Sequence, residues 1–584
     1  MIGALLVAVI LVVFLSAWNR SFVAMGLDGW FPQLAERWQA GEVPYRDFFL
    51  PLPPLHLLEH SLLIRLFGSG LAVPRLVGTL GRALTGVFLF LWLIRIYRPS
   101  MALTAAAATS IVFSADISDS VFFYNHNSVF LAMIAAFAAA TSLGRRHLAA
   151  LSLAAIAGGA SALCLLEKQT IGAALTVVLA LLLFVLGSRR SALAFAAGWS
   201  LPTGWTVGWL ISQDALQPFL SQVLFGGTSA KGPLLQVLLR PLIATAQFPW
   251  LSRPAILACL ILIVLAAFAR SIGRTRTTPT GPWALLSAGS AAMAAVLLGG
   301  ASYPRSFRFV AIYVALFGSV VIAARLWRSY LAGQRDEVTS QRLFLGMVSV
   351  TVAYALSLSW PAWEPMVLPG LGFVLCEIER ESSQRGGRAT EMAILASALL
   401  IYGAAADKAR TPYGWAEWIE PSAHVAGSRP TNTRLSGLRL SQSTSAFLDN
   451  IVGLVRQYSG PSDRVFVFPN LPIVYWLSER QPATFSPNHW FDVASDDIST
   501  AAAASLRNSP PAVLVDYEIS ETEWRTNEAI FRGGKPCGQR ILHQTLEELG
   551  GGPLYVKIAE MAAPISRNRV TIWARHDRVV PRTP

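Results

Sequence analysis

Residues 170–187 read TIGAALTVVLALLLFVLG and contain no charged side chain. These eighteen residues come close to the roughly 20 that an α-helix needs to cross a bilayer core of about 30 Å. Glu167, Lys168 and Gln169 stand directly before the segment, and Arg189 and Arg190 follow it. A long apolar segment with polar residues only at its ends predicts a transmembrane helix.

Similar apolar segments recur along the first two thirds of the chain. They cover residues 2–18, 73–94, 101–115, 121–143, 148–166, 191–212, 254–269, 282–300, 308–324, 343–359, 364–376 and 390–406. The segments at 101 and 364 are short and could be re-entrant, so we expect about 11–13 transmembrane helices. A chain of 584 residues with 53% hydrophobic and only 14% charged residues fits a polytopic α-helical membrane protein.

Arginines mark every second loop between these segments. They are Arg95, Arg98, Arg145, Arg146, Arg189, Arg190, Arg270, Arg274, Arg276, Arg325, Arg328, Arg380, Arg385 and Arg388. Short loops rich in Lys and Arg stay in the cytoplasm, so the N-terminus is predicted inside and the chain from residue 407 outside. The net charge of +13 therefore reflects membrane topology and not a nucleic-acid partner, because the basic residues stand in ones and twos. Residue usage and short loops favour a bacterial plasma (inner) membrane.

Two domains are expected: a transmembrane domain at 1–406 and a soluble extracytoplasmic α/β domain at 407–584. Within the first outer loop, 19–72, the stretches 30–40 and 54–67 predict two helices that lie along the membrane interface. In the soluble domain, periodicity predicts a helix at 446–458 and strands at 464–468, 512–516, 554–558 and 570–574.

The outer loops and the soluble domain contain the unusual motifs. They are Leu27-Asp28-Gly29-Trp30-Phe31, Gly41-Glu42-Val43-Pro44-Tyr45-Arg46-Asp47-Phe48-Phe49, Pro53-Pro54-Leu55-His56, Tyr124-Asn125-His126-Asn127, Glu167-Lys168-Gln169 and Leu471-Pro472-Ile473-Val474-Tyr475-Trp476-Leu477-Ser478-Glu479-Arg480. In order and topological side they resemble the GT-C superfamily of glycosyltransferases, which includes protein O-mannosyltransferases, aminoarabinose transferases and arabinosyltransferases. An acidic residue after the first span, followed by two interfacial helices, is typical of that family.

The resemblance implies an inverting transfer of a monosaccharide from a polyprenyl-phosphate donor to a hydroxyl group of a glycan, lipid or protein. Asp28 is then the expected catalytic base; the alternative is that it caps the helix beginning near Trp30. The departing phosphate needs positive charge. We expect it from Lys168 with Gln169, and from Arg305 and Arg308, although arginines at this depth are often interfacial anchors.

Sugar or acceptor contacts are expected from Tyr45, Asp47, Tyr124, Asn125, His126 and Asn127. The alternatives are turn closure for Asp47 and interhelical hydrogen bonding for Asn125–Asn127. Many relatives carry an acidic residue in that last segment, and Asn is a poor ligand for hard cations. We therefore expect no metal and no cofactor, while Asp116 and Asp119 nearby leave a divalent metal open.

Two other functions share this topology. A lipid-linked glycan ligase or polymerase usually depends on Arg and His in a large outer loop, but the 213–253 loop has no His. A lipid or sugar transporter commonly shows repeated halves with ionisable groups near the membrane centre. Here the ionisable residues gather at the outer ends of the spans.

Overall fold

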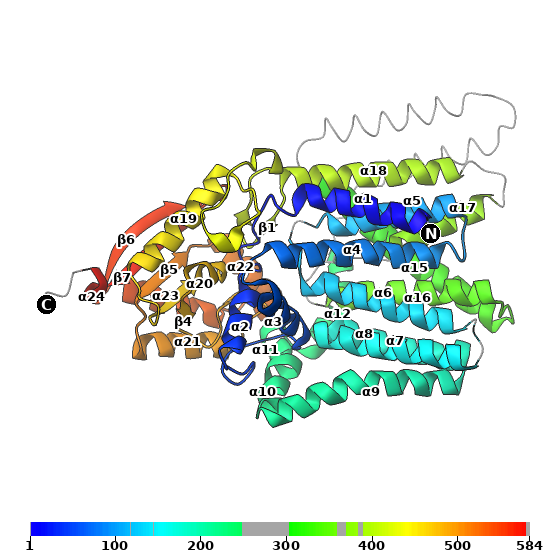
Figure 1. The fold of residues 1–584 in the computed structure, drawn as a ribbon, viewed down its shortest axis with the longest axis horizontal. Helices are drawn as coiled ribbons and strands as arrows, with labels where there is room; N and C mark the ends of the chain where they lie inside the picture. Colours follow the sequence, from blue (N-terminus) through cyan, green and yellow to red (C-terminus); the bar gives the residue numbers. More distant parts are fainter. Residues whose placement is uncertain are drawn as a thin grey trace.

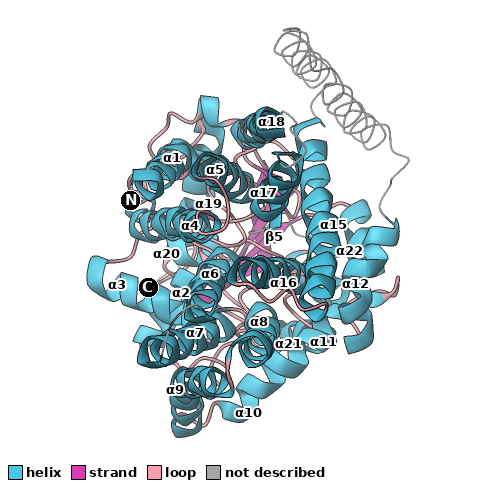
Figure 2. Ribbon diagram, turned by 90° about the vertical axis from the view of Figure 1, so that its right-hand side faces the viewer, coloured by secondary structure: helices cyan, strands magenta, loops and turns pink. Residues whose placement is uncertain are grey.

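A computed structural model describes residues 2–247 apart from 117, 144 and 146, together with 303–358, 370–383 and 389–579. The molecule is elongated, with a bundle of long helices at one end and a domain containing a sheet at the other (Figure 1). The helices of the bundle are seen end-on in Figure 2, and the strands lie behind them. The predicted spans at 254–269 and 282–300 lie outside the described residues.

The helices of the bundle match the predicted segments closely. They are α1 (Ile2–Trp18), α4 (Ala72–Leu93), α5 (Pro99–Ser114), α6 (Tyr124–Leu143), α7 (His147–Glu167), α8 (Gln169–Leu182), α9 (Arg189–Ser212), α15 (Tyr303–Leu331), α16 (Glu337–Ser357), α17 (Gly370–Ser383) and α18 (Ala389–Arg410). A short π-helix, Leu183–Gly187, continues α8. Among the described residues, four helices are long and apolar enough to cross a membrane: Ala72–Leu93, Tyr124–Leu143, Leu148–Glu167 and Gln169–Gly187. The predicted polytopic helical architecture is confirmed.

Small residues allow the helices to pack closely. A Cβ added to Gly158 of α7 would lie 1.9 Å from the carbonyl oxygen of Phe195 in α9. A Cβ added to Gly198 of α9 would lie 2.0 Å from the carbonyl oxygen of Ala155. Membrane helices gain little from hydrophobic burial against each other, so such close backbone contact is what holds them together.

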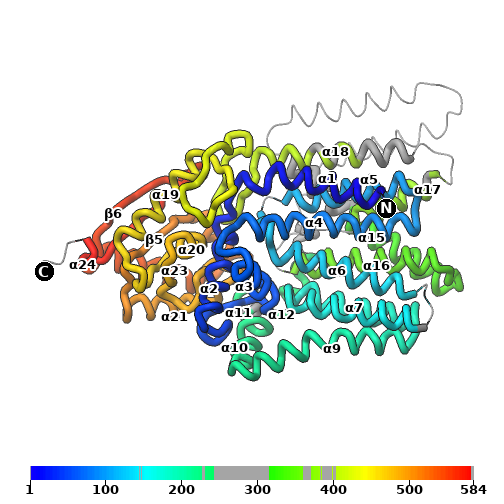
Figure 3. Tube along the Cα trace, in the orientation of Figure 1, coloured from blue at the N-terminus to red at the C-terminus, as the bar shows by residue number. Residues whose placement is uncertain are grey.

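Short helices separate the bundle from the sheet-containing end, and Figure 3 traces them through this layer. The two predicted in the first outer loop are present as α2 (Trp30–Gln39) and α3 (Leu55–Phe67). Three more follow α9: α10 (Leu216–Phe219), α11 (Gly226–Lys231) and α12 (Leu234–Gln247). Trp30, Phe31 and Leu34 of α2 form one hydrophobic core with Leu210 and Val223.

The C-terminal part has a five-stranded mixed sheet in the order β4-β3-β5-β7-β6. The strands are β3 (Arg464–Phe468), β4 (Gln481–Pro482), β5 (Val513–Tyr517), β6 (Tyr555–Ala562) and β7 (Arg569–Arg575). β3 runs parallel to β4 and β5, and β7 runs antiparallel to β5 and β6. The helices of this part are α19 (Gln442–Gln457), α20 (Ile473–Ser478), α21 (Asp496–Asn508), α22 (Glu521–Arg532) and α23 (Gly538–Gly550). The helix and four strands predicted from periodicity are all present.

The first outer loop packs into the C-terminal part. Phe22, Val23, Ala24 and Met25 belong to the same hydrophobic core as the strands. A Cβ on Gly29 would lie 2.1 Å from Cα of Ile473, so this close approach requires glycine.

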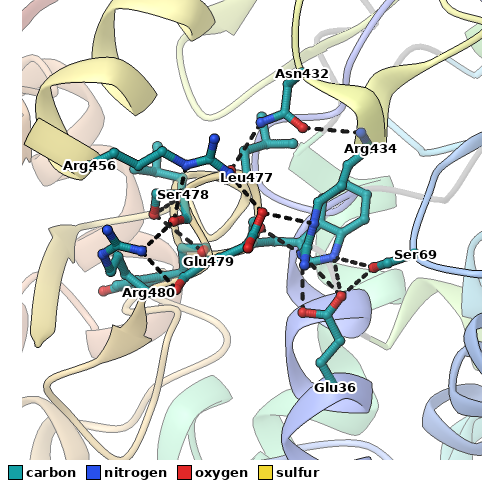
Figure 4. A network of polar contacts seen from close by, with 12 residues as sticks. Glu36, Ser69, Asn432, Arg434, Arg456, Leu477, Ser478, Glu479 and Arg480 are labelled. Atoms are coloured by element: carbon teal, nitrogen blue, oxygen red, sulfur yellow. Dashed lines mark hydrogen bonds and ion pairs between the residues drawn. The ribbon is translucent and has the colours of Figure 1, made fainter. Parts of the chain in front are cut away.

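Polar contacts also join the first outer loop to the C-terminal part. Arg434 donates to Glu36 of α2 at 3.0 Å and to the carbonyl oxygen of Trp476 at 2.7 Å (Figure 4). The indole of Trp476 also donates to Glu36, at 3.1 Å. The membrane part and the C-terminal part are therefore joined around the first outer loop.

Candidate functional site

Two cavities lie where the bundle, the short helices and the C-terminal part meet. The polar cavity has a volume of about 640 Å³, part of it open to solvent, and is lined by Gly26, Leu27, Trp30, Ser118, Asp119, Phe123, Tyr124, Asn125, Lys168, Lys231, Trp415, Asn470, Asn488, Trp490, Asp492 and Val493. Its walls combine carboxylates, amides, cations and aromatic rings, which is the mixture that binds sugars through hydrogen bonds and ring stacking.

The apolar cavity has a volume of about 940 Å³, part of it open to solvent, and is lined mainly by hydrophobic side chains. They are Trp30, Pro51, Leu52, Tyr124, Val223, Leu224, Ala230, Leu234, Val237, Leu358 and Val493, with Lys168, Gln169, Thr170, Gly226, Lys231 and Asp492 as the other lining residues. Trp30, Tyr124, Lys168, Lys231, Asp492 and Val493 line both cavities. The two cavities therefore adjoin at a point that carries two cations and one carboxylate.

Lys168 occupies the break between α7 and α8. Its backbone is extended (φ −147°, ψ 113°), which ends one helix and begins the next and leaves the side chain directed inward. The side chain is buried; its ammonium donates to Oδ1 of Asn125 and lies 5.5 Å from the centre of the Tyr124 ring. A buried ammonium at the boundary of both cavities can receive a phosphate group.

The Tyr124–Asn127 motif forms the first turn of α6 and faces several partners. Asn125 accepts from Lys168 and lines the polar cavity, together with Tyr124. His126 is buried; its Nδ1 lies 3.2 Å from Arg82 and 3.5 Å from Asp119. Asn127 donates to Glu59 at 2.8 Å. The motif therefore makes interhelical hydrogen bonds, and two of its members also border the cavity.

Asp28 lies in the wall behind the polar cavity. Its carboxylate accepts hydrogen bonds from Arg75 at 2.6 Å, from Ser120 at 2.5 Å and from the backbone N–H of Ala24 at 2.7 Å. Gly26 and Leu27 line the cavity, but Asp28 is not among its described lining residues. Gly29 is the N-cap of α2 and receives no side-chain cap, so Asp28 holds the loop and does not cap the helix.

Asp119 is the acidic residue of the 116–120 segment that lines the polar cavity. It is buried and lies next to Ser120, which binds Asp28. Both carboxylates act on Tyr413: burial raises the pKa of this hydroxyl well above its usual value, and the charges of Asp28 and Asp119 raise it further. Burial and these two charges therefore keep Tyr413 a neutral phenol.

The remaining predicted residues fall into three groups. Gln169 lines the apolar cavity and donates to the carbonyl oxygens of Pro51 and Val223, at 3.4 Å each. Tyr45 donates to the carbonyl oxygen of Leu52 at 2.8 Å, and Asp47 closes its turn by accepting from the N–H of Val43 at 2.7 Å. Neither of these two is among the described residues lining the cavities. Arg305 and Arg308 lie in the first turns of α15, where the structure describes the helix but not the side chains.

Sequence reasoning missed the half of the polar cavity that the C-terminal part provides. Asn470, Asn488, Trp490 and Asp492 line it from loops around the five-stranded sheet, and Trp415 lines it from the short strand β1 (Gly414–Trp415). The only local signal is the dense polar and aromatic run Asn488-His489-Trp490-Phe491-Asp492. Lys231 of α11 was not predicted either; it lies 3.7 Å from Asp492 and links the 213–253 loop to this wall.

No protein-family model matches the chain, and no curated protein matches its sequence significantly. Solved structures are similar to it in overall chain path. ArnT from Cupriavidus metallidurans bound to undecaprenyl phosphate is 16% identical, with 99% of this chain and 98% of that chain covered and a TM-score of 0.42.

Two further structures are similar at comparable levels. The archaeal oligosaccharyltransferase AglB from Archaeoglobus fulgidus, in complex with an inhibitory peptide and a dolichol-phosphate, is 12% identical over 100% of this chain and 74% of that chain, with a TM-score of 0.47. The mycobacterial arabinofuranosyltransferase AftD is 14% identical over 98% of this chain and 40% of that chain, with a TM-score of 0.40. At these values the likeness concerns the overall fold and assigns no role to a residue.

Proposed function

We propose that this chain is an inverting glycosyltransferase that moves a monosaccharide from a polyprenyl-phosphate donor to a hydroxyl acceptor at the outer face of the membrane. The observation that carries the proposal is the meeting of two unlike cavities at Lys168. A prenyl chain suits the apolar cavity, a sugar suits the polar one, and the phosphate between them suits the cations at the boundary.

The phosphate is bound, in this proposal, by Lys168 together with Lys231. Both ammonium groups belong to residues that line the two cavities. As the glycosidic bond to the phosphate breaks, negative charge grows on the leaving oxygen, and nearby fixed cations stabilise it most in the transition state. Arg305 and Arg308 remain predictions for the same role.

The acceptor hydroxyl needs a base within hydrogen-bond reach. Asp119 meets that requirement because it lines the polar cavity. Asp28 is the base that the family resemblance implies, but Arg75 and Ser120 hold its carboxylate in the wall, and it is not among the described residues that line the polar cavity. Geometry thus favours Asp119 and the resemblance favours Asp28.

Asp28→Asn and Asp119→Asn in the purified full-length protein separate these assignments. The assay follows release of free undecaprenyl phosphate from undecaprenyl-phosphate hexoses and pentoses, with a hydroxyl acceptor present. Replacing the base should lower kcat by about 10²- to 10⁴-fold. Asp449→Asn, which removes an exposed partner of Thr431, is the matched control.

The outcomes decide between the candidates. A large kcat loss in Asp119→Asn alone assigns the base to Asp119, and the same loss in Asp28→Asn alone, in a protein that still melts cooperatively, assigns it to Asp28. Movement of intact donor lipid across a vesicle membrane without release of polyprenyl phosphate contradicts the enzyme proposal and supports a transporter.

A further inference from the structure

Three metal-ligating side chains meet outside the two cavities, between α3 and α7. Nδ1 of His56 lies 2.9 Å from Oε1 of Glu167 and 3.4 Å from Oε2 of Glu59. One ligand atom from each residue lies within 4.8 Å of the other two. The side chains of His56 and Glu167 are fully buried, and that of Glu59 is 30% exposed.

The buried polar atoms of this cluster are poorly satisfied. Both oxygens of Glu167 lack a well-formed hydrogen bond within the described residues, and so does Nε2 of His56. Nδ1 of the neighbouring His60 is also buried without such a bond. Unsatisfied buried groups of this kind often mark the place of an ion.

The charges of the cluster call for a cation. The carboxylates of Glu167 and Glu59 both lie against the single imidazole of His56 in a largely buried site. Buried carboxylates are unfavourable unless a cation pairs with them. A divalent cation that replaces the imidazole proton would neutralise the cluster.

The geometry and chemistry of these ligands suit zinc. One imidazole nitrogen and two carboxylate oxygens bind Zn²⁺ at roughly 2.0–2.2 Å, which places ligand atoms of a tetrahedral site about 3.4 Å apart. The separation of 3.4 Å between His56 and Glu59 matches this value, and the 2.9 Å between His56 and Glu167 is shorter. Mg²⁺ and Ca²⁺ prefer oxygen ligands throughout, so the nitrogen of His56 favours a transition metal.

We infer that His56, Glu59 and Glu167 form a binding site for a divalent transition metal, with Zn²⁺ the best match. Asn127 donates to Glu59 at 2.8 Å and holds this ligand from α6. The ion would tie α3 to the end of α7, directly before Lys168. The site goes beyond the sequence-based expectation of no metal and does not depend on the proposed function.

The test measures metal content, not activity. Full-length protein without affinity-tag histidines is equilibrated with ZnCl₂ in detergent, passed over a desalting column and analysed by elemental mass spectrometry. Wild type should retain about one zinc ion per chain, and His56→Ala and Glu167→Gln should retain almost none. His543→Ala, which removes a partly buried histidine paired with Asp516, is the matched control and should retain zinc as wild type does.

A second measurement on wild type alone covers the case in which the variants do not fold. Co²⁺ in place of Zn²⁺ should give a visible absorption band that Zn²⁺ abolishes and that weakens as the pH falls, because metal and protons compete for His56. Wild type that retains no zinc and shows no such band overturns the inference, and the cluster is then an ion triad held by the imidazole proton. Equal zinc retention by a folded His56→Ala variant overturns it as well.

Discussion

The two walls of the polar cavity differ in charge. The wall built by the membrane part carries Asp119 and Lys168, both buried among helices. The wall built by the C-terminal part carries Trp415, Asn470, Asn488, Trp490 and Asp492, which are amides and indoles apart from one acid. Groups that can accept a proton or bind a phosphate thus come mainly from the bundle, and neutral groups suited to sugar recognition come mainly from the domain.

This difference leads us to expect different kinetic effects from substitutions in the two walls of the polar cavity. Changes on the membrane side should lower kcat, because they remove charge that acts in the transition state. Changes on the domain side should raise KM, because they remove contacts made equally in the ground state. The expected effects decrease from the membrane wall to the domain wall.

Lys168→Met, on the membrane wall, should have the largest effect. It removes the buried ammonium at the boundary of the cavities while keeping much of the volume. We expect kcat to fall by about 10²- to 10³-fold, as for loss of one group that stabilises a developing negative charge. Steady-state kinetics with a polyprenyl-phosphate sugar measure this; Lys557→Met, at an exposed lysine of β6, should leave kcat unchanged. A Lys168→Met enzyme with normal kcat would remove Lys168 from the phosphate site.

Glu420→Gln should change how the stability of the C-terminal part depends on pH. Burial raises the pKa of Glu420 to about 7 from its usual 4.5, and hydrogen bonds from Thr444 and Trp418 offset only part of this. Because the pKa is higher in the folded state, this contribution to stability is complete below about pH 4.5 and is lost as the pH rises through 7.

The measurement is thermal unfolding of the full-length protein between pH 5 and pH 8. Across this pH range, the free energy of unfolding should fall by about 2 kcal/mol more in wild type than in Glu420→Gln. Glu518→Gln, which changes an exposed partner of Arg569, should follow wild type. Identical pH profiles for wild type and Glu420→Gln would mean that ionisation of Glu420 does not destabilise the folded domain.

Asn470→Ala should have the smallest effect and a different kinetic signature. The side chain lines the polar cavity, where an amide is suited to hydrogen-bond a sugar hydroxyl. Loss of one such bond, worth about 1 kcal/mol, should raise KM about fivefold with little change in kcat. Asn508→Ala, at an exposed position at the end of α21, is the control. A drop in kcat at constant KM would contradict the proposed division between the walls.

Much of the fold follows from local pattern. The spans before residue 213 were predicted to within three residues, because a lipid-facing helix must be apolar over its whole length. Helices α15, α16 and α17 differ from the predicted spans by up to seven residues at an end. Residues 464–468 form the predicted strand with the same bounds, since alternation there is regular. The site was only partly predictable: Lys168 and Asn125 stand in motifs, but their mutual hydrogen bond depends on how α6 packs against α7.

The sequence by itself determined the apolar spans, the two short helices of the first outer loop, four of the five strands of the sheet and the resemblance to GT-C glycosyltransferases, because each depends on residues close together in the chain. Only the tertiary structure decided that Asp28 binds Arg75 and Ser120, that Asp119 borders the cavity, and that His56 and Glu59 meet Glu167. These pairings join residues dozens of positions apart. Their distances are set by helix packing and by the close contact at Gly29, which no local pattern encodes.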